Sequence, residues 1–327
     1  MLGSVHDADD ALQDTLLRAW RGAAGLRDAG SARAWLYSIA TNVCLTELDR
    51  RRKRVLPHEF GQAAALHTPP GVPEIESTWI EPYPSEAMGI TPGRANPEAS
   101  YEQREGLELA FVAALQHLAG PQRAMLILRE VMGFSAREVA TMLQTTVASV
   151  NSGLQRARNT VRERVGPRTQ QQTLRALGDG GLHRLVDRYI EAWERNDVDA
   201  FTALLVEDAT FAMPPLTTWY TPRETIAVWA REFSLSGAWR WKPVLTEANA
   251  QPALAFYSWD GAAEAHVPFA LNVLSLREGL VSDVTAFIVR AIDATEPEAY
   301  QRFPEQPMAQ RQVSLAFQRF GLPDRLR

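Results

Sequence analysis

The chain has 327 residues, 46% hydrophobic and 22% charged, a composition that favours two or three folded domains and argues against a disordered protein. It has no apolar stretch near the ~20 residues of a membrane span, no basic and apolar start typical of a secretory signal, and one cysteine, Cys44. We therefore expect a cytoplasmic protein with no disulfide framework, no metal site and no cofactor, and the net charge of −5 gives by itself no sign of a nucleic-acid partner.

The N-terminal segment predicts two helices. Residues 7–22 begin with acidic residues, which stabilise the positive end of a helix, and place apolar residues at helical spacing. We expect this stripe to face the core: Leu12, Leu16, Ala19 and Trp20. A second helix is expected from an N-cap at Ser31 to the basic run that ends at Arg54, with its own apolar stripe from Trp35 to Leu48.

Residues 55–100 change character. They contain eight prolines and little periodicity, which predicts an extended linker. The aromatic island Trp79–Pro84 interrupts this linker. Aromatic residues in a proline-rich segment can dock onto a folded surface, or they can be incidental in a solvated linker, and the sequence leaves both interpretations open.

The next segment, 101–168, predicts helices at 101–118, 122–132, 135–143 and 147–165. Ser135 and Glu138 have the spacing of a capping box, and a three-residue turn at 144–146 separates the last two helices. Val147, Val150 and Leu154 are expected to anchor the final helix. This pattern predicts a helix-turn-helix, whose outward face would read DNA. That face comprises Ser149, Asn151, Ser152, Gln155, Arg156 and Arg158.

The charge distribution supports a DNA-binding role for this segment. Residues 107–168 contain eight arginines against four glutamates, although the whole chain is acidic. Short polar groups near the helix start suit base edges, and arginines near its end suit phosphates. An ordinary helical hairpin with a solvated face would share this pattern, so the hairpin alone does not decide the function.

The C-terminal segment predicts an α+β domain, with helices packed on one face of a curved, mostly antiparallel sheet. Helices are expected at 181–195, 198–205 and 223–233, and in the tail at 296–320. The candidate strands are 209–213, 239–247, 253–259, 267–276 and 281–289.

Several phrases together resemble the extracytoplasmic-function sigma factors of the sigma-70 family. Residues 7–20 and 34–42 are similar to sigma region two, and residues 123–131 and 150–158 are similar to the region-four helix-turn-helix. The resemblance implies a multidomain fold with two all-α helical modules. It also implies core RNA polymerase and promoter DNA as partners. We expect region two at 1–54, the proline-rich linker at 55–100 and region four at 101–168.

The resemblance also implies a division of labour. Region four would read the minus-thirty-five element through the helix face described above. The first helix would bind polymerase through Asp10, Gln13, Asp14, Leu17 and Arg18. The minus-ten element would be bound by Arg33, Trp35, Asn42, Arg50, Arg51, Arg52, Lys53 and Arg54. Aromatic, polar and cationic groups suit unpaired bases and their backbone, although Trp35 can equally be a core residue and a basic run can simply be solvated.

The N-terminus departs from the family pattern. Sigma factors of this type begin with a further helix or two before the residues that match Met1 to Ser4. Either the true start lies upstream of Met1 or the chain is a truncated paralogue, and truncation would put polymerase binding in doubt.

Residues 185–201 and 204–215 resemble SnoaL-like domains of the NTF2-like superfamily, which implies an α+β cone at 180–327. Sigma factors with such an extension form known groups, and the resemblance implies that the cone tunes activity through the sigma core or the linker at Trp79–Pro84. Such cones often enclose a small-molecule pocket. The expected pocket residues are Tyr189, Trp193, Met213, Trp219, Trp229, His266 and Phe287, although plain core packing would explain any one of them.

Two functions from different classes follow. The first is a non-enzymatic sigma factor that directs promoter-specific initiation and is tuned by the cone. The alternative is an NTF2-like small-molecule sensor or enzyme with degenerate sigma modules, in which Asp208, His266 and Asp283 would form an acid–base set. A simple one-module repressor is disfavoured because it would leave residues 7–54 without a purpose.

Overall fold

A computed structural model describes residues 1–25, 32–51, 53–71, 79–85, 104–106, 108–165, 168–288 and 316–327. The expected N-cap Ser31, Arg52 and most of the expected tail helix at 296–320 lie outside these residues. The chain divides into two compact units. One unit comprises Met1–Val55 with Thr91–Arg168, and the other comprises Leu56–Ile90 with Thr169–Arg327.

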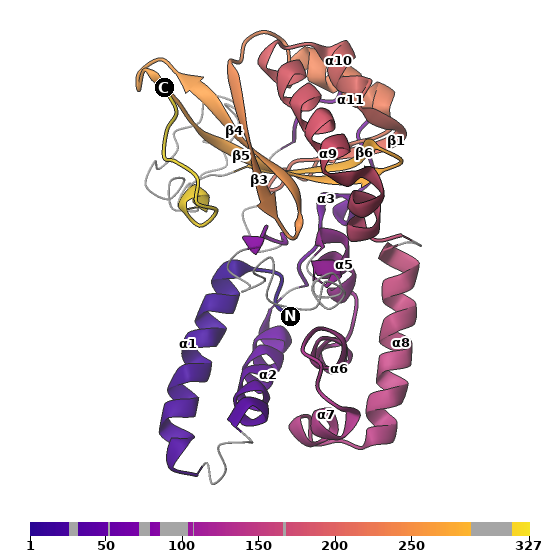
Figure 1. Ribbon diagram of the computed structural model, residues 1–327, viewed down its shortest axis with the longest axis vertical. Helices are drawn as coiled ribbons and strands as arrows, with labels where there is room; N and C mark the ends of the chain where they lie inside the picture. The colour runs from indigo at the N-terminus through magenta and orange to yellow at the C-terminus, as the bar shows by residue number, and fades with distance from the viewer. Residues whose placement is uncertain are drawn as a thin grey trace. The chain divides into compact units, whose positions relative to one another are not determined.

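The first unit begins with two long helices that run side by side, α1 (Val5–Gly22) and α2 (Ala32–Arg50) (Figure 1). The Ser4 hydroxyl caps α1 by accepting a hydrogen bond from the Asp7 amide, at 3.2 Å. A short 3-10 turn (Ala23–Gly25) follows α1. Both predicted helices are therefore confirmed, although α2 ends four residues before the expected Arg54.

The packing face of α1 differs from the prediction. Small residues at every fourth position are buried: Ala11, Thr15 and Ala19. Leu12 and Leu16 are more than half exposed and Trp20 is 79% exposed, so the prediction that they face the core was wrong. Small side chains allow two helices to approach closely, and they leave the neighbouring bulky stripe on the outside.

The second half of this unit contains α5 (Leu109–Leu115), α6 (Gly120–Leu126), α7 (Ala136–Met142) and α8 (Val147–Val165), with a π turn (Ile127–Val131) after α6. The Ser135–Glu138 capping box is present, as predicted. Gln144 adopts φ 51° in the turn before α8, the conformation that a glycine would otherwise provide. Val150 and Leu154 are buried as expected, but Val147 is 43% exposed and does not anchor α8.

The second unit is a six-stranded sheet with the order β2-β1-β6-β5-β4-β3. The strands are β1 (Leu205–Ala212), β2 (Trp219–Tyr220), β3 (Trp241–Ala248), β4 (Gln251–Asp260), β5 (Ala265–Arg277) and β6 (Leu280–Ile288). All neighbours are antiparallel except β1 and β6. The five predicted strands are confirmed, whereas the two-residue β2 is too short to have been predicted from a pattern.

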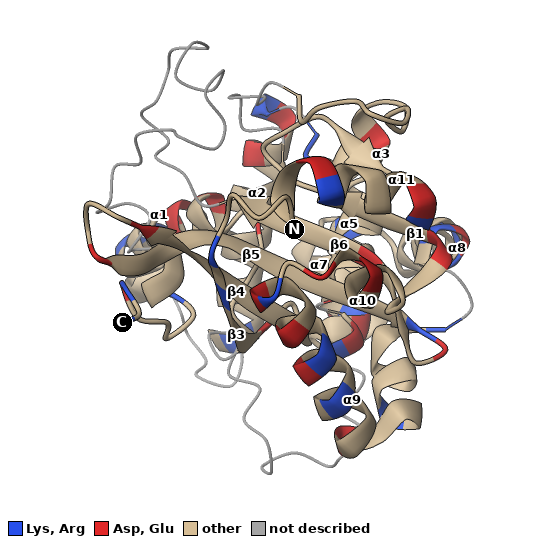
Figure 2. Ribbon diagram, turned by 90° about the horizontal axis from the view of Figure 1, so that it is seen from above, with Lys and Arg blue, Asp and Glu red and all other residues tan. Residues whose placement is uncertain are grey.

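Helices α9 (Gln170–Glu194), α10 (Val198–Thr202) and α11 (Arg223–Trp229) lie on one face of this sheet, and their apolar residues share a core with it. A π turn (Ala230–Ser234) extends α11. Helix α9 begins eleven residues before the predicted 181 and contains a kink at Gly178, whose φ is 68°. Along its length α9 carries arginines together with Asp and Glu, as Figure 2 shows.

The first part of the proline-rich segment folds onto this sheet and includes a short helix, α3 (Pro57–Phe60). Farther along, Pro84 pairs with Ala248 at the end of β3. At the C-terminus, Phe317 is buried against Tyr257, and Leu326 pairs with His266 on β5. Among the described residues, no helix has both the length and the apolar character that a membrane crossing requires.

Candidate nucleic-acid interface and aromatic cavity

The outer face of α8 is the candidate surface for double-stranded DNA. Asn151, Ser152, Gln155 and Arg156 are exposed, and Ser149 is half-buried. Val150 and Leu154 are buried on the opposite face of α8, which therefore fixes the direction in which the exposed side chains point. The Thr146 hydroxyl accepts a hydrogen bond from the Ser149 amide at 3.1 Å and caps the helix start.

Arg158 has a different environment from the other five predicted residues. Its guanidinium lies 2.5 Å from Glu130 Oε1, on the π turn that follows α6, with a second hydrogen bond at 3.0 Å. Both side chains are at least 39% exposed, so water screens this ion pair. Arg158 can exchange Glu130 for a phosphate at little cost in free energy.

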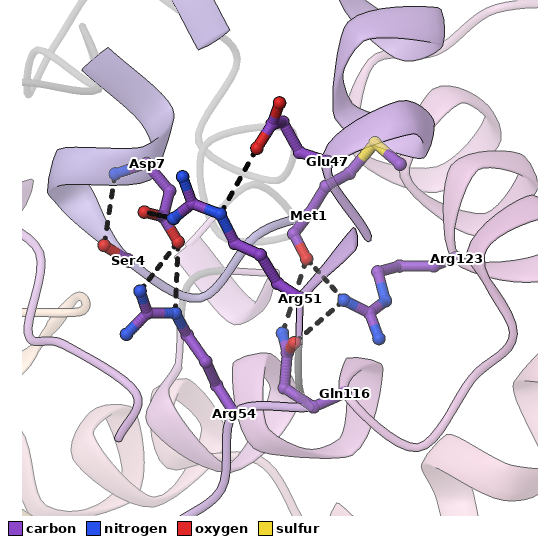
Figure 3. A network of polar contacts seen from close by, with 8 residues as sticks. All are labelled: Met1, Ser4, Asp7, Glu47, Arg51, Arg54, Gln116 and Arg123. Atoms are coloured by element: carbon purple, nitrogen blue, oxygen red, sulfur yellow. Dashed lines mark hydrogen bonds and ion pairs between the residues drawn. The ribbon is translucent and has the colours of Figure 1, made fainter. Parts of the chain in front are cut away.

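The basic run after α2 is largely engaged within the first unit (Figure 3). Arg54 is buried and donates to Asp7 Oδ2 at 2.7 Å and 3.2 Å. Arg51 also binds Asp7, through Oδ1, and lies 3.2 Å from Glu47. These two arginines, expected to bind DNA, hold the N-terminal end of α1 in this structure.

The other members of the run differ in exposure. Arg50 is exposed and lies 3.7 Å from Glu47. Lys53 is exposed, with its Nζ 2.7 Å from Nδ1 of His117. Arg52 lies outside the described residues. Of the described members, Arg50 and Lys53 therefore present their charge to solvent most directly.

Arg123 forms a second polar cluster beside this one (Figure 3). It donates to the Met1 carbonyl at 2.6 Å and to Gln116 Oε1 at 2.8 Å. Burial lowers the pKa of Arg123 to about 10, so it stays cationic at neutral pH. Together with Asp7, Arg51 and Arg54 it lines a polar cavity of about 210 Å³.

Arg33 joins the two halves of the first unit. Its guanidinium donates to the Met132 carbonyl at 2.7 Å and lies 4.4 Å from the centre of the Phe134 ring. Tyr37, one turn along α2, meets the same ring edge-on at 5.2 Å. Of the other predicted minus-ten residues, Trp35 is half-buried beside Gly22, and Asn42 is exposed.

The second unit contains an aromatic cavity of about 40 Å³ between α9, α11 and the sheet. Its lining residues are Trp193, Phe211, Met213, Trp229, Phe233, Ser234, Trp239, Trp241, Phe256, Phe269, Ala270, Asn272, Ala286 and Ile288. None of them carries a charge. Three predicted pocket residues are therefore in the lining, namely Trp193, Met213 and Trp229.

Four other predicted pocket residues lie outside that lining. Tyr189 is buried and stacks on Trp193 at 6.1 Å, and burial raises the pKa of its hydroxyl. Trp219 faces the linker, His266 packs on Trp259, and Phe287 on β6 is buried elsewhere. The pattern of aromatic residues indicated a pocket, but it could not show which of them face the cavity.

Known family models match segments of both units. Residues 1–54 match the family model for sigma-70 region 2, residues 108–161 match sigma-70 region 4, and residues 186–284 match the SnoaL-like domain. The ECF RNA polymerase sigma factor SigG of Mycobacterium tuberculosis strain H37Rv is 38% identical over 330 residues, which cover 100% of this chain and 80% of SigG. The chain belongs to the ECF RNA polymerase sigma factors. As a member of this family, it directs promoter-specific transcription initiation by core RNA polymerase.

Two further relatives show which parts of this sigma factor are shared. SigM of Mycobacterium tuberculosis strain H37Rv is 30% identical over 153 residues, which cover 47% of this chain and 61% of SigM. The crystal structure of Mycobacterium tuberculosis extracytoplasmic function sigma factor SigJ aligns with a TM-score of 0.53 at 20% identity. That alignment covers 88% of this chain and 89% of SigJ, so the fold with both units is shared.

The helix of this sigma factor that was expected to bind polymerase presents the predicted residues on its surface. Asp10, Gln13, Leu17 and Arg18 are exposed on α1. Asp14 lies 2.7 Å from Arg18, and both side chains are nearly half exposed. Polar and charged groups on a rigid helix suit a protein partner.

The candidate acid–base set of this sigma factor does not converge. Asp208 pairs with Arg277 at the surface, which lowers the pKa of its carboxyl group. Asp283 accepts hydrogen bonds from Thr210 and Thr285. His266 packs on Trp259, and burial lowers its pKa. None of the three lines the cavity, and no group of three metal-binding side chains occurs in the described part of the chain.

Proposed function

We propose that the SnoaL-like domain of this sigma factor controls transcription by holding the interdomain linker. In this proposal the chain acts in the cytoplasm without catalysis of its own. Region two would lie at 1–54, region four at 101–168 and the cone at 180–327. Asn151, Gln155 and Arg156 on α8 would read the minus-thirty-five element, while Asn42, Arg50 and Lys53 would contribute to the minus-ten element. The exposed polar face of α1 would bind polymerase.

The observation that carries the proposal is the docking of the linker at two places on the sheet. At the first, the Ala64 amide donates to the Trp219 carbonyl at 2.8 Å, Trp219 Nε1 donates to the Gly61 carbonyl at 2.9 Å, and the Tyr220 hydroxyl donates to the Thr68 carbonyl at 3.1 Å. Each of these hydrogen bonds involves a backbone atom of the linker, so together they fix the position of the linker backbone.

The second docking place is the turn between β3 and β4. Asn249 and Ala250 adopt φ 53° and 54°, a conformation that presents their amides outward. Asn249 exchanges hydrogen bonds with Tyr83 at 2.9 Å in both directions, and the Ala250 amide donates to Ser85 Oγ at 2.9 Å. The adjacent Trp79 and Ile80 are 8% and 0% exposed. The aromatic island is therefore a docking element, which supports the first of the two interpretations drawn from the sequence.

Docking of the linker opposes promoter binding for a geometric reason. The two promoter elements are about 25 base pairs apart, which corresponds to about 85 Å at ~3.4 Å per base pair. Regions two and four contact each other in the first unit through Arg33 and Phe134, so they cannot read both elements in this arrangement. They must separate, and a linker held to the sheet at two places has less free length for that separation.

Transcription from a cognate promoter with core polymerase tests this proposal. Asn249→Gly removes the side-chain bond to Tyr83 and keeps the positive φ, and Tyr220→Phe removes the bond to Thr68. We expect each variant to raise the amount of transcript about two- to fivefold, because each loses one hydrogen bond worth about 1 kcal/mol. Tyr257→Phe is the matched control, since its hydroxyl binds Pro323 in the tail. Transcript levels unchanged in both linker variants would contradict the proposal.

A further inference from the structure

The polar cavity of the first unit contains a buried cation whose hydrogen-bond partners are all neutral. Arg123, on α6, is 4% exposed, and its guanidinium points toward Met1 (Figure 3). It donates to the carbonyls of Met1 and Leu118, at 2.6 Å and 3.3 Å, and to Gln116 Oε1 at 2.8 Å. Its Nε has no acceptor among the described residues. A buried charge is unfavourable unless an opposite charge pairs with it, so Arg123 favours an anion in this cavity.

Arg54 lines the same cavity and provides a contrast. It is 6% exposed, yet Asp7 accepts two hydrogen bonds from it. Arg123 has no such carboxylate among the described residues, and burial is the cause of its lowered pKa. Of these two buried arginines, Arg123 is therefore the one that still lacks an anion.

The cavity has more cations than carboxylates. Its charged lining residues are Arg51, Lys53, Arg54 and Arg123, with Asp7, Glu47 and Asp49. Asp7 pairs with Arg51 and Arg54, and Glu47 also pairs with Arg51. These ion pairs lie within region two, and none of them includes Arg123, which comes from region four. An added anion would therefore offset the charge of Arg123 without breaking an existing pair.

The cavity is large enough for a small anion. Its volume of about 210 Å³ exceeds the ~150 Å³ of a cavity that binds benzene. Asp49, Arg51 and Lys53 are exposed lining residues, so solvent reaches the cavity from their side. A small ion, or the terminal phosphate of a small molecule, can enter there, whereas duplex DNA is far too wide.

We propose that this cavity binds a phosphate group, held by Arg123 at its buried end and by Lys53 at its exposed side. Arginine and lysine form charge-assisted hydrogen bonds with phosphate oxygens. Phosphate keeps a proton at neutral pH and can donate it to a lining carboxylate, Glu47 or Asp49. Sulfate has the same shape and carries no proton, so the carboxylates repel it. The mixed lining therefore selects phosphate over sulfate.

The bound phosphate would join regions two and four. Asp7, Arg51 and Lys53 contribute to the cavity from region two, and Gln116 and Arg123 contribute from region four. A ligand that contacts both sides stabilises the arrangement in which they meet, which is the arrangement that the Arg33 contact also stabilises. The site involves neither the linker nor the sheet, so it does not depend on the proposed function.

Titration calorimetry of the full chain with inorganic phosphate, at constant ionic strength, tests the site. We expect saturable binding of a single phosphate, and binding of sulfate about tenfold weaker, because sulfate loses one charge-assisted hydrogen bond. Titration with ADP identifies the source of the phosphate group. Tighter binding of ADP than of phosphate indicates the end of a nucleotide, and weaker binding indicates the free ion.

Two variants and a matched control assign the cations. Arg123→Met should abolish phosphate binding, and phosphate should then no longer raise the unfolding temperature as it does in the wild-type chain. Lys53→Met changes an exposed side chain and should weaken binding about fivefold. Arg50→Met is the control, because Arg50 is exposed in the same basic run and does not line the cavity.

Three results would overturn the proposal. They are absence of saturable phosphate binding to the wild-type chain, equal affinities for phosphate and sulfate, and equal losses in Lys53→Met and Arg50→Met. The last result would show that the ion responds only to the general charge of the basic run.

Hydrogen exchange tests whether the phosphate joins the two regions. The Asp7 amide donates to Ser4 Oγ in region two, and the Arg123 amide donates to the Ala119 carbonyl in region four. Saturating phosphate should slow exchange of both amides about threefold or more in the wild-type chain, and sulfate at the same ionic strength should slow neither. Slower exchange of only one of the two amides would overturn the joining role.

Discussion

Substitution of Arg33 by leucine should open the contact between regions two and four. Arg33 donates a charge-assisted hydrogen bond to the Met132 carbonyl and lies over the Phe134 ring. Such a bond contributes about 1.5–3 kcal/mol and an exposed cation–π contact about 0.5–1 kcal/mol. Because Arg33 is solvent-exposed, we reduce the sum to about 1–2 kcal/mol. The closed population should therefore fall relative to the open one by about five- to thirtyfold.

Energy transfer between two dyes measures this change in the full chain. With Cys44 replaced by serine, cysteines at His6 on α1 and at Asn159 on α8 carry the dyes, since both positions are exposed. Arg33→Leu should lower transfer efficiency, whereas Arg158→Ala should leave it unchanged because its ion pair with Glu130 lies within region four. Equal transfer in the wild-type chain and Arg33→Leu would refute the role assigned to this contact.

Two further predictions concern the helix-turn-helix. Ser135→Ala should destabilise α7 by about 1 kcal/mol at pH 7, measured by hydrogen exchange of its amides. The pKa of Glu138 is lowered chiefly by its hydrogen bond with Ser135. The ionised carboxylate therefore stabilises α7 above the pKa that Glu138 has in the unfolded chain, and this stabilisation is lost as the pH falls through its pKa in the folded chain. The difference in stability between Ser135→Ala and the wild-type chain should shrink below pH ~4, and a difference independent of pH would be inconsistent with the capping box. Arg156→Ala should weaken binding to promoter duplex and reduce the salt slope of log K by about 1, and an unchanged slope would exclude a phosphate contact.

The helix-turn-helix could be predicted because its signals are local. The capping box, the turn and the buried positions Val150 and Leu154 all lie within twenty residues of one another. Its error, Val147, lies at the helix start, where the side chain is exposed instead of packed in the core. The five longer strands could be predicted for the same reason, since their apolar patterns are local.

Features that depend on distant partners could not be predicted. The stripe Leu12–Leu16–Trp20 is apolar, yet the packing face of α1 is decided by how closely α2 approaches its small residues. The lining of the aromatic cavity could not be predicted for the same reason, because it depends on residues that are distant in the sequence. The tryptophans predicted an aromatic core, but Asn272 was not predicted as a lining residue. The available signal was a single amide in the apolar strand 267–276, which faces the cavity only because of the strand's register.

Two interpretations of Arg54, a contact with DNA and an ion pair within region two, can be separated by experiment. The basic run predicts a DNA contact, whereas burial and two hydrogen bonds to Asp7 make Arg54 a structural residue of region two. Breaking a buried pair costs about 3–5 kcal/mol, but Asp7 keeps Arg51 as a partner, so we expect Arg54→Met to cost about 2–3 kcal/mol.

Asp7→Asn should cost more than Arg54→Met, because it leaves Arg54 buried without its anion. The double variant should be more stable than the sum of the two single losses predicts, by about 1–3 kcal/mol. Hydrogen exchange of the α1 amides in the full chain gives these values, with Arg50→Met as the exposed control that leaves exchange unchanged. Additive losses would show that the two side chains do not act as a pair. If Arg54→Met lost promoter affinity while the α1 amides kept their protection from hydrogen exchange, Arg54 would be a DNA-binding residue after all.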